Sequence, residues 1–436
     1  MSRSDSTNSN GNQPKRESEP RFVPARMGTR WHTLSALIER IEAAFIADYV
    51  GQSDLLAQAD TPAKRYTLIH DTAEYVLAVE SIQLSRQELA EVISQVYSNL
   101  FGYGPLDELF QDERVTTIAL EGADKASVRY GHDELVTLDP LFRDSRHLRQ
   151  IVERLLFDAG AELREDQPFV EAGLFVGKRP VCVNLLAPPV AFYLTVDIRV
   201  HPSVAPTMDD LVEQDFMSAQ AKQLLEAMVQ SSHGLMIVGD GESGKTTLLN
   251  ALLQLLPTDA KIVTIERAGE LRPPSAVERF VTQWPVRDVE GRTFGEQIDR
   301  GLEQQPAHLI LDEVRSDEPE SIAPLLQHEN APRQIWAFRG PSFAKRLASA
   351  LGMLARRADI SQSEAMVHAL YARLPYVITV RRSQGKLQLH TVSEWQYHDS
   401  EYPAFVALME HEDGVLRPTG RRPVHTLDLP DDFWNA

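Results

Sequence analysis

Residues 239–247 read GDGESGKTT, and their spacing satisfies the phosphate-loop pattern G-x-x-x-x-G-K-[ST]. An apolar run, LMIV, precedes the loop, and a helical pattern beginning TTLLNALL follows it. Glycines let successive backbone N–H groups point at phosphate oxygens, and the N-terminus of the following helix adds its dipole. The stretch therefore predicts a binding site for ATP with Mg²⁺.

Two residues of this loop have the chemistry for distinct contacts. Lys245 is expected to contact the β- and γ-phosphates, and the Thr246 hydroxyl is expected to ligate Mg²⁺. The whole loop is predicted to contribute to the nucleotide site: Gly239, Asp240, Gly241, Glu242, Ser243, Gly244, Lys245, Thr246 and Thr247.

Acidic residues end two apolar runs that follow the loop in the sequence. HLILDEV ends in Asp312 and Glu313, and IVTIERAGEL places Glu266 after another apolar run. Ligands of open parallel sheets lie at the carboxyl ends of the strands, so we expect these acids to face the phosphate site. Asp312 is predicted to hold the Mg²⁺ shell, and Glu313 to orient or deprotonate water.

The elements that must position these groups form several regions. Helical spacing predominates over 29–100, short β-type runs surround one helix over 101–201, and Pro202 and Pro206 mark a linker over 202–216. Apolar strands alternate with helices over 217–396, which predicts a mainly parallel α/β sheet. Residues 1–28 are rich in Ser, Asn, Gly and Pro and are predicted to be disordered, and 397–436 form a C-terminal tail.

Composition excludes several classes of protein. With 44 Lys+Arg against 63 Asp+Glu, the formal net charge is −19, which makes nucleic acid an unfavourable partner. The chain contains 1 Cys, so no internal disulfide and no cysteine-based metal site can form. The N-terminus has no signal-peptide pattern and no run is apolar and long enough to span a membrane, so direct membrane insertion is not expected.

Other phosphate-loop classes fit poorly, because neither the N-K-x-D pattern of GTPases nor the L-S-G-G-Q signature of ABC transporters occurs. The order of the sequence blocks resembles that of the secretion and pilus-assembly ATPases of the type II/type IV secretion superfamily, most closely the Tad-type pilus motors. The resemblance covers about residues 31–420 and is carried by these blocks: LFGYGPLDELFQDERVTTIALEG, GDGESGKTTLLNALL, IVTIERAGEL, GLEQQPAHLILDEVRSDE and LPYVITVRRSQGKLQLHTVSEW.

This resemblance implies a RecA-like motor domain with a mainly parallel sheet, preceded by a smaller α/β (PAS-like) domain and a helical N-terminal region. It also implies a ring, usually a hexamer. Glu266 and Glu313 match the two catalytic carboxylates, and Lys245 is placed with them in the catalytic set. Arg199, Arg315 and His328 match further nucleotide-site positions of the family.

Several family motif positions depart from the pattern. The aspartate of the Asp box is Arg267, the second His-box histidine is Trp336, and Gly173 stands where the family can supply an arginine finger. Arg179 is near that position but out of register. Such an arginine or sensor histidine stabilises charge on the γ-phosphoryl group in the transition state. The retained groups therefore predict ATP binding, and the departures predict slow turnover.

Two functions follow from these features. The first is an oligomeric ATPase that powers pilus assembly or protein secretion at the cytoplasmic face of the inner membrane, through a membrane platform protein. It is favoured by the phosphate loop and the acids that accompany it. The second, favoured by the departures, is a hydrolysis-poor nucleotide-binding scaffold that co-assembles with a competent motor.

Overall fold

The computed structural model describes residues 22–24, 31–49, 59–274, 277–316, 318–327, 331–341, 343–383, 385–396, 404–412 and 415–435. The disorder predicted for residues 1–28 concerns residues that, apart from 22–24, lie outside these ranges. The chain divides into two compact units, 1–107 and 108–436, and the boundary falls inside helix α5 (Leu106–Gln111).

The first unit is helical, with one short antiparallel strand pair. Its elements are β1 (Phe22–Pro24), β2 (Trp31–Thr33), α1 (Leu34–Tyr49), α3 (Pro62–Glu80) and α4 (Arg86–Phe101). A capping box begins α4, because Ser85 and Glu88 each bond the other's backbone N–H. The apolar faces of the three helices pack into one core, as their three- and four-residue spacing requires.

The second unit begins with a six-stranded antiparallel sheet in the order β5-β4-β3-β8-β7-β6. Its elements are β3 (Val115–Glu121), β4 (Lys125–Tyr130), β5 (Val136–Leu138), α6 (Ser145–Asp158), β6 (Phe169–Val176), β7 (Arg179–Leu186) and β8 (Thr195–Val200). Burial alternates along β8, which is typical of a strand with one face on a core. We call residues 108–201 the sheet layer.

The rest of this unit, 202–436, is called the motor layer below. Its helices and strands are α7 (Met208–Glu213), α8 (Ala219–Gln230), β9 (Leu235–Gly239), α9 (Lys245–Leu253), β10 (Ile262–Glu266), β11 (Glu278–Val281), α10 (Phe294–Glu303), β12 (His308–Arg315), η1 (Pro319–Ser321), α11 (Ala323–Gln327), β13 (Arg333–Arg339), α12 (Ala344–Ala358), α13 (Ser363–Arg373), β14 (Tyr376–Ser383), β15 (Lys386–Gln396), β16 (Ala404–Glu412), β17 (Val415–Pro418) and η2 (Asp431–Trp434).

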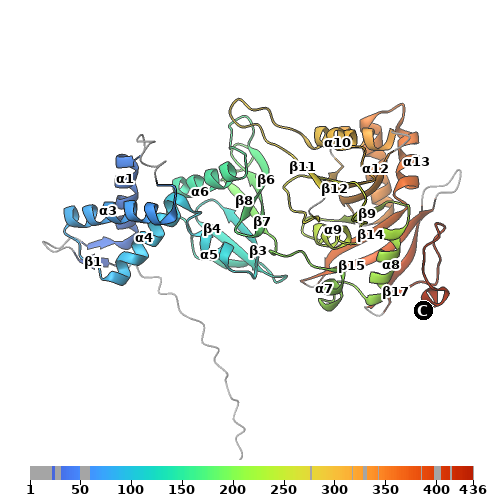
Figure 1. Cartoon of the computed structure of the whole chain (residues 1–436), viewed down its shortest axis with the longest axis horizontal. Helices are drawn as coiled ribbons and strands as arrows, with labels where there is room; N and C mark the ends of the chain where they lie inside the picture. The colour runs from blue at the N-terminus through green and yellow to red at the C-terminus, as the bar shows by residue number, and fades with distance from the viewer. Residues whose placement is uncertain are drawn as a thin grey trace, which may run out of the picture. The chain divides into compact units, whose positions relative to one another are not determined.

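A nine-stranded sheet organises the motor layer, in the order β11-β10-β12-β13-β9-β14-β15-β16-β17. The strands from β11 to β14 are parallel, and β15 to β17 extend the sheet as antiparallel strands (Figure 1). Strands β9 and β10 are buried along their whole length, because both faces of the sheet are covered by separate apolar clusters. The predicted α/β fold class is confirmed.

Two segments outside the predicted motor boundaries join the same core. Strands β16 and β17 continue the sheet beyond residue 396, and Phe433 and Trp434 are buried in the cluster that includes α8 and α9. Within the predicted linker, Thr207 caps α7, and Met208 and Leu211 of that helix are buried in this cluster.

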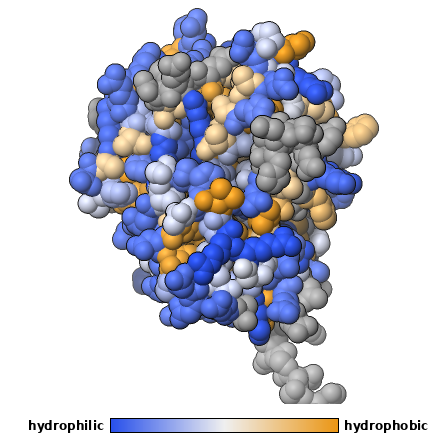
Figure 2. All heavy atoms as spheres, turned by 90° about the vertical axis from the view of Figure 1, so that its right-hand side faces the viewer, coloured by the Kyte–Doolittle hydropathy of each residue, from blue (hydrophilic) through white to orange (hydrophobic). Residues whose placement is uncertain are grey.

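The surface in Figure 2 is mainly hydrophilic, and its apolar side chains occur in separate small groups. Among the helices within the described ranges, none combines the length and the apolarity needed to cross a bilayer.

Candidate active site

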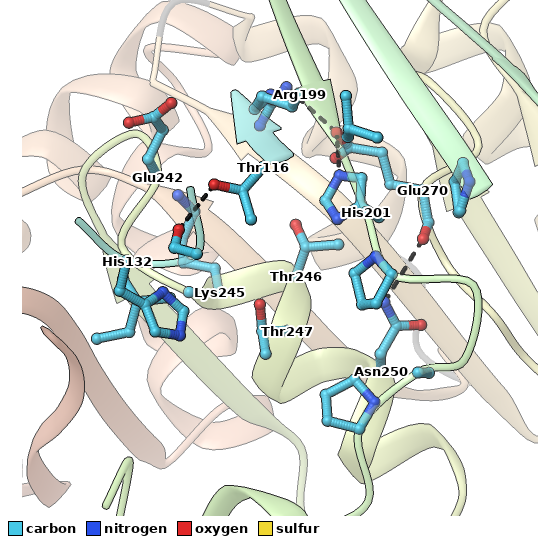
Figure 3. Close-up of a pocket in the computed structure, with 18 of the residues that line it drawn as sticks. Thr116, His132, Arg199, His201, Glu242, Lys245, Thr246, Thr247, Asn250 and Glu270 are labelled. Atoms are coloured by element: carbon cyan, nitrogen blue, oxygen red, sulfur yellow. Dashed lines mark hydrogen bonds and ion pairs between the residues drawn. The ribbon is translucent and has the colours of Figure 1, made fainter. Parts of the chain in front are cut away.

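A cavity of about 470 Å³ lies beside the phosphate loop, and residues of both the sheet layer and the motor layer line it (Figure 3). The loop contributes residues 242–247, which run from the end of β9 into the first turn of α9. Glu313 comes from β12, and Arg199 comes from β8 of the sheet layer. The fold therefore brings the predicted loop, one predicted carboxylate and Arg199 to one cavity.

Backbone geometry explains the glycines of this loop. Gly244 has φ +95°, which side-chain-bearing residues rarely adopt, and a Cβ there would lie 3.1 Å from the Phe216 ring. A Cβ on Gly239 would lie 2.4 Å from Ser243 Oγ. The tight turn of the phosphate loop therefore requires these glycines. Within this turn the Ser243 hydroxyl is buried without a hydrogen-bond partner.

Lys245 is buried at the base of the loop and pairs with Glu313. Its ammonium group donates to the carbonyl oxygen of Asp240 at 2.8 Å and lies 3.2 Å from Glu313 Oε2. Burial acts to raise the pKa of the Glu313 carboxyl, but the positive charges around it outweigh burial and lower that pKa; these charges are Lys245, Arg315, Arg199 and Arg339. Glu313 is therefore ionised at neutral pH and can orient a water molecule by accepting its hydrogen bond.

The predicted metal residues are adjacent. Thr246 Oγ1 donates to Asp312 Oδ1 at 3.2 Å, and Asp312 is buried behind the threonine and does not line the cavity. Burial raises the pKa of Asp312 well above its ordinary value, and the charges of Glu270, Glu313 and Glu266 add to that effect. A bound cation would oppose this shift, since positive charge favours the carboxylate.

Glu266 occupies a different environment from the one predicted. It is fully buried at the end of β10, where Arg279 donates to both of its carboxylate oxygens at 2.8 and 2.9 Å. The Thr264 hydroxyl and the backbone N–H of Leu271 donate to it as well, each at 2.9 Å. Glu266 does not line the cavity, and its contacts fix the course of the chain from 266 to 271.

Glu270, four residues later, lines the cavity in its place. Its Oε1 lies 3.0 Å from His201 Nε2 and 3.5 Å from the Arg199 guanidinium (Figure 3). Burial acts to raise the pKa of Glu270, but the charges of Arg199 and His201 outweigh burial and lower it. Sequence reasoning missed this residue, although the second glutamate of IVTIERAGEL was the available signal.

Arg315 of β12 lines a second cavity, of about 610 Å³. Its guanidinium bonds both carboxylate oxygens of Glu171 at 2.9 and 2.7 Å and lies 3.2 Å from Glu313 Oε1. Arg267 lines the same cavity, bonds both carboxylate oxygens of Glu318 and donates to the Glu313 carbonyl at 2.7 Å. These ion pairs thus fix the end of β12, through Arg315 on the strand itself and through Arg267, which follows β10.

The remaining departures from the family pattern are packing residues in this chain. Trp336 is fully buried in β13, and its indole N–H donates to Gln334 Oε1 at 3.0 Å. Gly173 faces the backbone of Ala268, whose carbonyl oxygen would lie 1.5 Å from a Cβ at that position. Arg179 donates to backbone carbonyls of the sheet layer, among them that of Asp112 at 2.8 Å. His328 lies outside the described residues.

The cavity fits a nucleoside triphosphate in its size and its polar groups. Its volume lies within the range of about 300–1,000 Å³ that is typical of small-molecule sites. Three residues that line it, Ser243, Arg199 and Arg272, each have a buried polar atom (Oγ, Nε and Nε) without a hydrogen-bond partner among the described residues. Native proteins rarely leave such atoms unpaired, so they point to a polar ligand.

Comparisons with known proteins identify relatives among secretion and transfer proteins. A model of the family described as "Type II/IV secretion system protein" matches residues 113–327. A protein named "Putative conjugal transfer protein" from Mycobacterium tuberculosis is 27% identical over 328 residues, which cover 71% of this chain and 93% of that protein. The type IV secretion system protein VirB11 of Brucella suis is 25% identical over 185 residues, covering 36% of this chain and 50% of VirB11.

Among solved structures, the VirB11 ATPase of Brucella suis aligns with a TM-score of 0.32 and 20% identity over 66% of this chain and 95% of that one. The Legionella pneumophila ATPase DotB aligns with a TM-score of 0.47 and 13% identity over 66% and 78%. The family match spans the sheet layer, the phosphate loop and β12, which together build the cavity. The family match and these relatives support the assignment of residues 113–327 to the type II/IV secretion superfamily.

Proposed function

We propose that the chain binds ATP with Mg²⁺ in the cavity beside the phosphate loop and hydrolyses it. The observation that carries this proposal is the pairing of Lys245 with Glu313, 3.2 Å apart, at a loop whose Ser243 hydroxyl is buried and unpaired. When ATP binds, Lys245 leaves the Asp240 carbonyl and the Glu313 carboxylate and contacts phosphate oxygens instead. Glu313 is then available to hold the attacking water. The Thr246 hydroxyl, with Asp312 behind it, would hold Mg²⁺, which when bound offsets the charge of the phosphate oxygens.

The arginines of the site have separate tasks in this proposal. Arg199 lines the cavity, so its guanidinium is placed to bind phosphate oxygens and to offset the charge that develops on them. Arg315 stays beside Glu313 and orients it from the second cavity. No residue at position 173 can serve as an arginine finger, because the Ala268 backbone occupies the space for a side chain.

We further propose that hydrolysis drives a motor for pilus assembly or protein secretion. The support comes from the family match and from relatives named as secretion and competence proteins, such as VirB11 and the competence protein ComGA of Halalkalibacterium halodurans. In this proposal the chain forms a ring, usually a hexamer, and acts at the cytoplasmic face of the inner membrane on a platform protein, as Tad-type motors do.

Phosphate release by the full chain tests the enzymatic part. The wild-type chain is expected to release phosphate from ATP with Mg²⁺ and to stop when EDTA removes the metal. Glu313→Gln should lower kcat by about 10²–10³, since it removes a charged group that orients water, and should leave ATP binding intact. An unchanged rate in Glu313→Gln would contradict the proposed role, and a wild type that binds ATP without any turnover would favour the scaffold function.

A further inference from the structure

The phosphate loop of this chain contains a glutamate that comes close to the site of a highly charged ligand. Glu242 has φ +54°, a conformation uncommon for residues other than glycine, and its side chain lines the same cavity as Lys245. Figure 3 draws Glu242 and Lys245 among the residues that line one pocket. A carboxylate at this position would repel the phosphates of ATP unless another group compensated its charge.

A residue of the sheet layer supplies that compensation. The guanidinium of Arg129, on β4, forms an ion pair with Glu242, and Thr117 on β3 donates to Glu242 Oε1 at 3.2 Å. The Arg129 side chain is 13% exposed and that of Glu242 is 29% exposed, so solvent screens the pair only partly. Arg129 itself does not line the cavity, so its closest contact with the phosphate loop is the ion pair with Glu242.

The surroundings of this pair contain few other charges that could replace Arg129. Burial raises the pKa of Asp197 on β8, and the Glu242 charge adds to that effect while Arg199 and Arg129 oppose it. Arg382 on β14 is another nearby cation, and its pKa is lowered by burial and then by the Arg129 charge, with Glu242 acting in the opposite direction. Arg382 directs its guanidinium to the carbonyl oxygen of His132 at 2.8 Å.

We propose that Arg129 is a positioning residue for nucleotide binding: it neutralises Glu242 and holds it against the sheet layer, so that the loop can accept a triphosphate. This inference rests on the proposed ATP binding. It also links the two layers, because loss of the sheet-layer contact would leave an uncompensated carboxylate in the phosphate loop. Closure of the two layers and affinity for phosphate would then depend on the same ion pair.

Calorimetry on the full chain tests this role. The affinities for ATP, ADP and AMP, each with Mg²⁺, are measured for the wild type, Arg129→Gln, Glu242→Gln and the double variant. Arg129→Gln should weaken ATP about ten- to a hundredfold, ADP less, and AMP least, because repulsion by the exposed carboxylate scales with phosphate charge. Adding Glu242→Gln to Arg129→Gln should restore ATP affinity to within about threefold of wild type.

Arg149→Gln is the matched control, because Arg149 pairs with Glu153 on the exposed side of α6 and should leave all three affinities unchanged. Thermal unfolding of each variant checks that the fold persists. Unchanged ATP affinity in Arg129→Gln, or an equal loss for ATP and AMP without rescue by Glu242→Gln, would overturn this inference. The pair would then have only a structural role, in which it holds the phosphate loop to the sheet layer. A wild-type chain that binds no ATP would overturn the proposed function and this inference together.

Discussion

The two cavities to which β12 contributes differ in how their charged groups are paired. Beside the phosphate loop, polar atoms of Ser243 and Arg199 are buried without partners, and Lys245 holds a carbonyl and a carboxylate that a ligand can replace. In the second cavity, Arg267 and Arg315 each bond both oxygens of one carboxylate. The first cavity is built to exchange partners with a ligand, and the second is built to hold β12 in place.

This difference also explains where the sequence departs from the family. Arg267 and Gly173 lie where the sheet layer meets the chain that follows β10, and Trp336 is in the core of the sheet. In this chain Gly173 and Trp336 contribute to packing, and Arg267 forms a fixed ion pair. The residues that line the first cavity retain phosphate-binding chemistry. The departures therefore remove the arginine finger expected at position 173, whereas the residues proposed to bind ATP are retained.

Lys245→Ala should give the largest effect and tests the first cavity directly. Removal of the ammonium group leaves Glu313 without one of its two closest cations and removes the expected contact with the β- and γ-phosphates, so ATP affinity should fall about a hundredfold or more. Titration with a fluorescent ATP analogue measures it. Lys125→Ala, which removes an exposed lysine paired with Glu121, is the control and should bind as wild type does. Equal affinity in both variants would place the nucleotide elsewhere.

The same substitution at two neighbouring acids sharpens the comparison. Glu270→Gln should lower the rate of ATP hydrolysis about tenfold, because Arg199 and His201 lose the charge that holds them at the cavity wall. Glu266→Gln should instead destabilise the fold by about 1–3 kcal/mol, since it removes the charge of a buried carboxylate that pairs with the partly exposed Arg279. Rates and thermal unfolding curves separate the two outcomes, and a purely catalytic loss in Glu266→Gln would reverse their roles.

Gly173→Ala tests the contact between the layers. The new Cβ would meet the Ala268 carbonyl oxygen, so the backbone of β6 or of the facing chain must move, at a cost of about 1–3 kcal/mol. Thermal unfolding should report this loss. Gly177→Ala is the comparison variant in the same sheet layer. No atom lies within 4 Å of a Cβ at that position, so its loss of stability comes only from the φ of +62°. A Gly173→Ala chain as stable as wild type would contradict the close approach.

Trp336→Phe should give the smallest effect. The ring stays in the core, but the Gln334 side chain loses its indole donor, which costs about 1–2 kcal/mol. ATP affinity should not change, because Trp336 does not line the cavity. Weakened ATP binding in a variant of normal stability would mean that this position still senses the nucleotide.

Sequence reasoning was most successful where backbone chemistry fixes the structure. The glycines and the helix start after Gly244 are local features, and the strand ending in Asp312 and Glu313 follows from an apolar run. The placement of Glu266 and Glu270 could not be predicted in this way, because it depends on Arg279 of the neighbouring strand β11 and on His201, which lies 69 positions from Glu270. The contact of Arg129 with Glu242 has the same origin, since it joins residues 113 positions apart.

A structure of the full chain with a non-hydrolysable ATP analogue and Mg²⁺ tests the central claim most directly. The account predicts phosphate oxygens within hydrogen-bond distance of Lys245 Nζ and the Ser243 hydroxyl, with Glu313 released from Lys245 and facing the γ-phosphate. An analogue bound in the second cavity, or a Lys245–Glu313 pair that persists with the nucleotide bound, would contradict it.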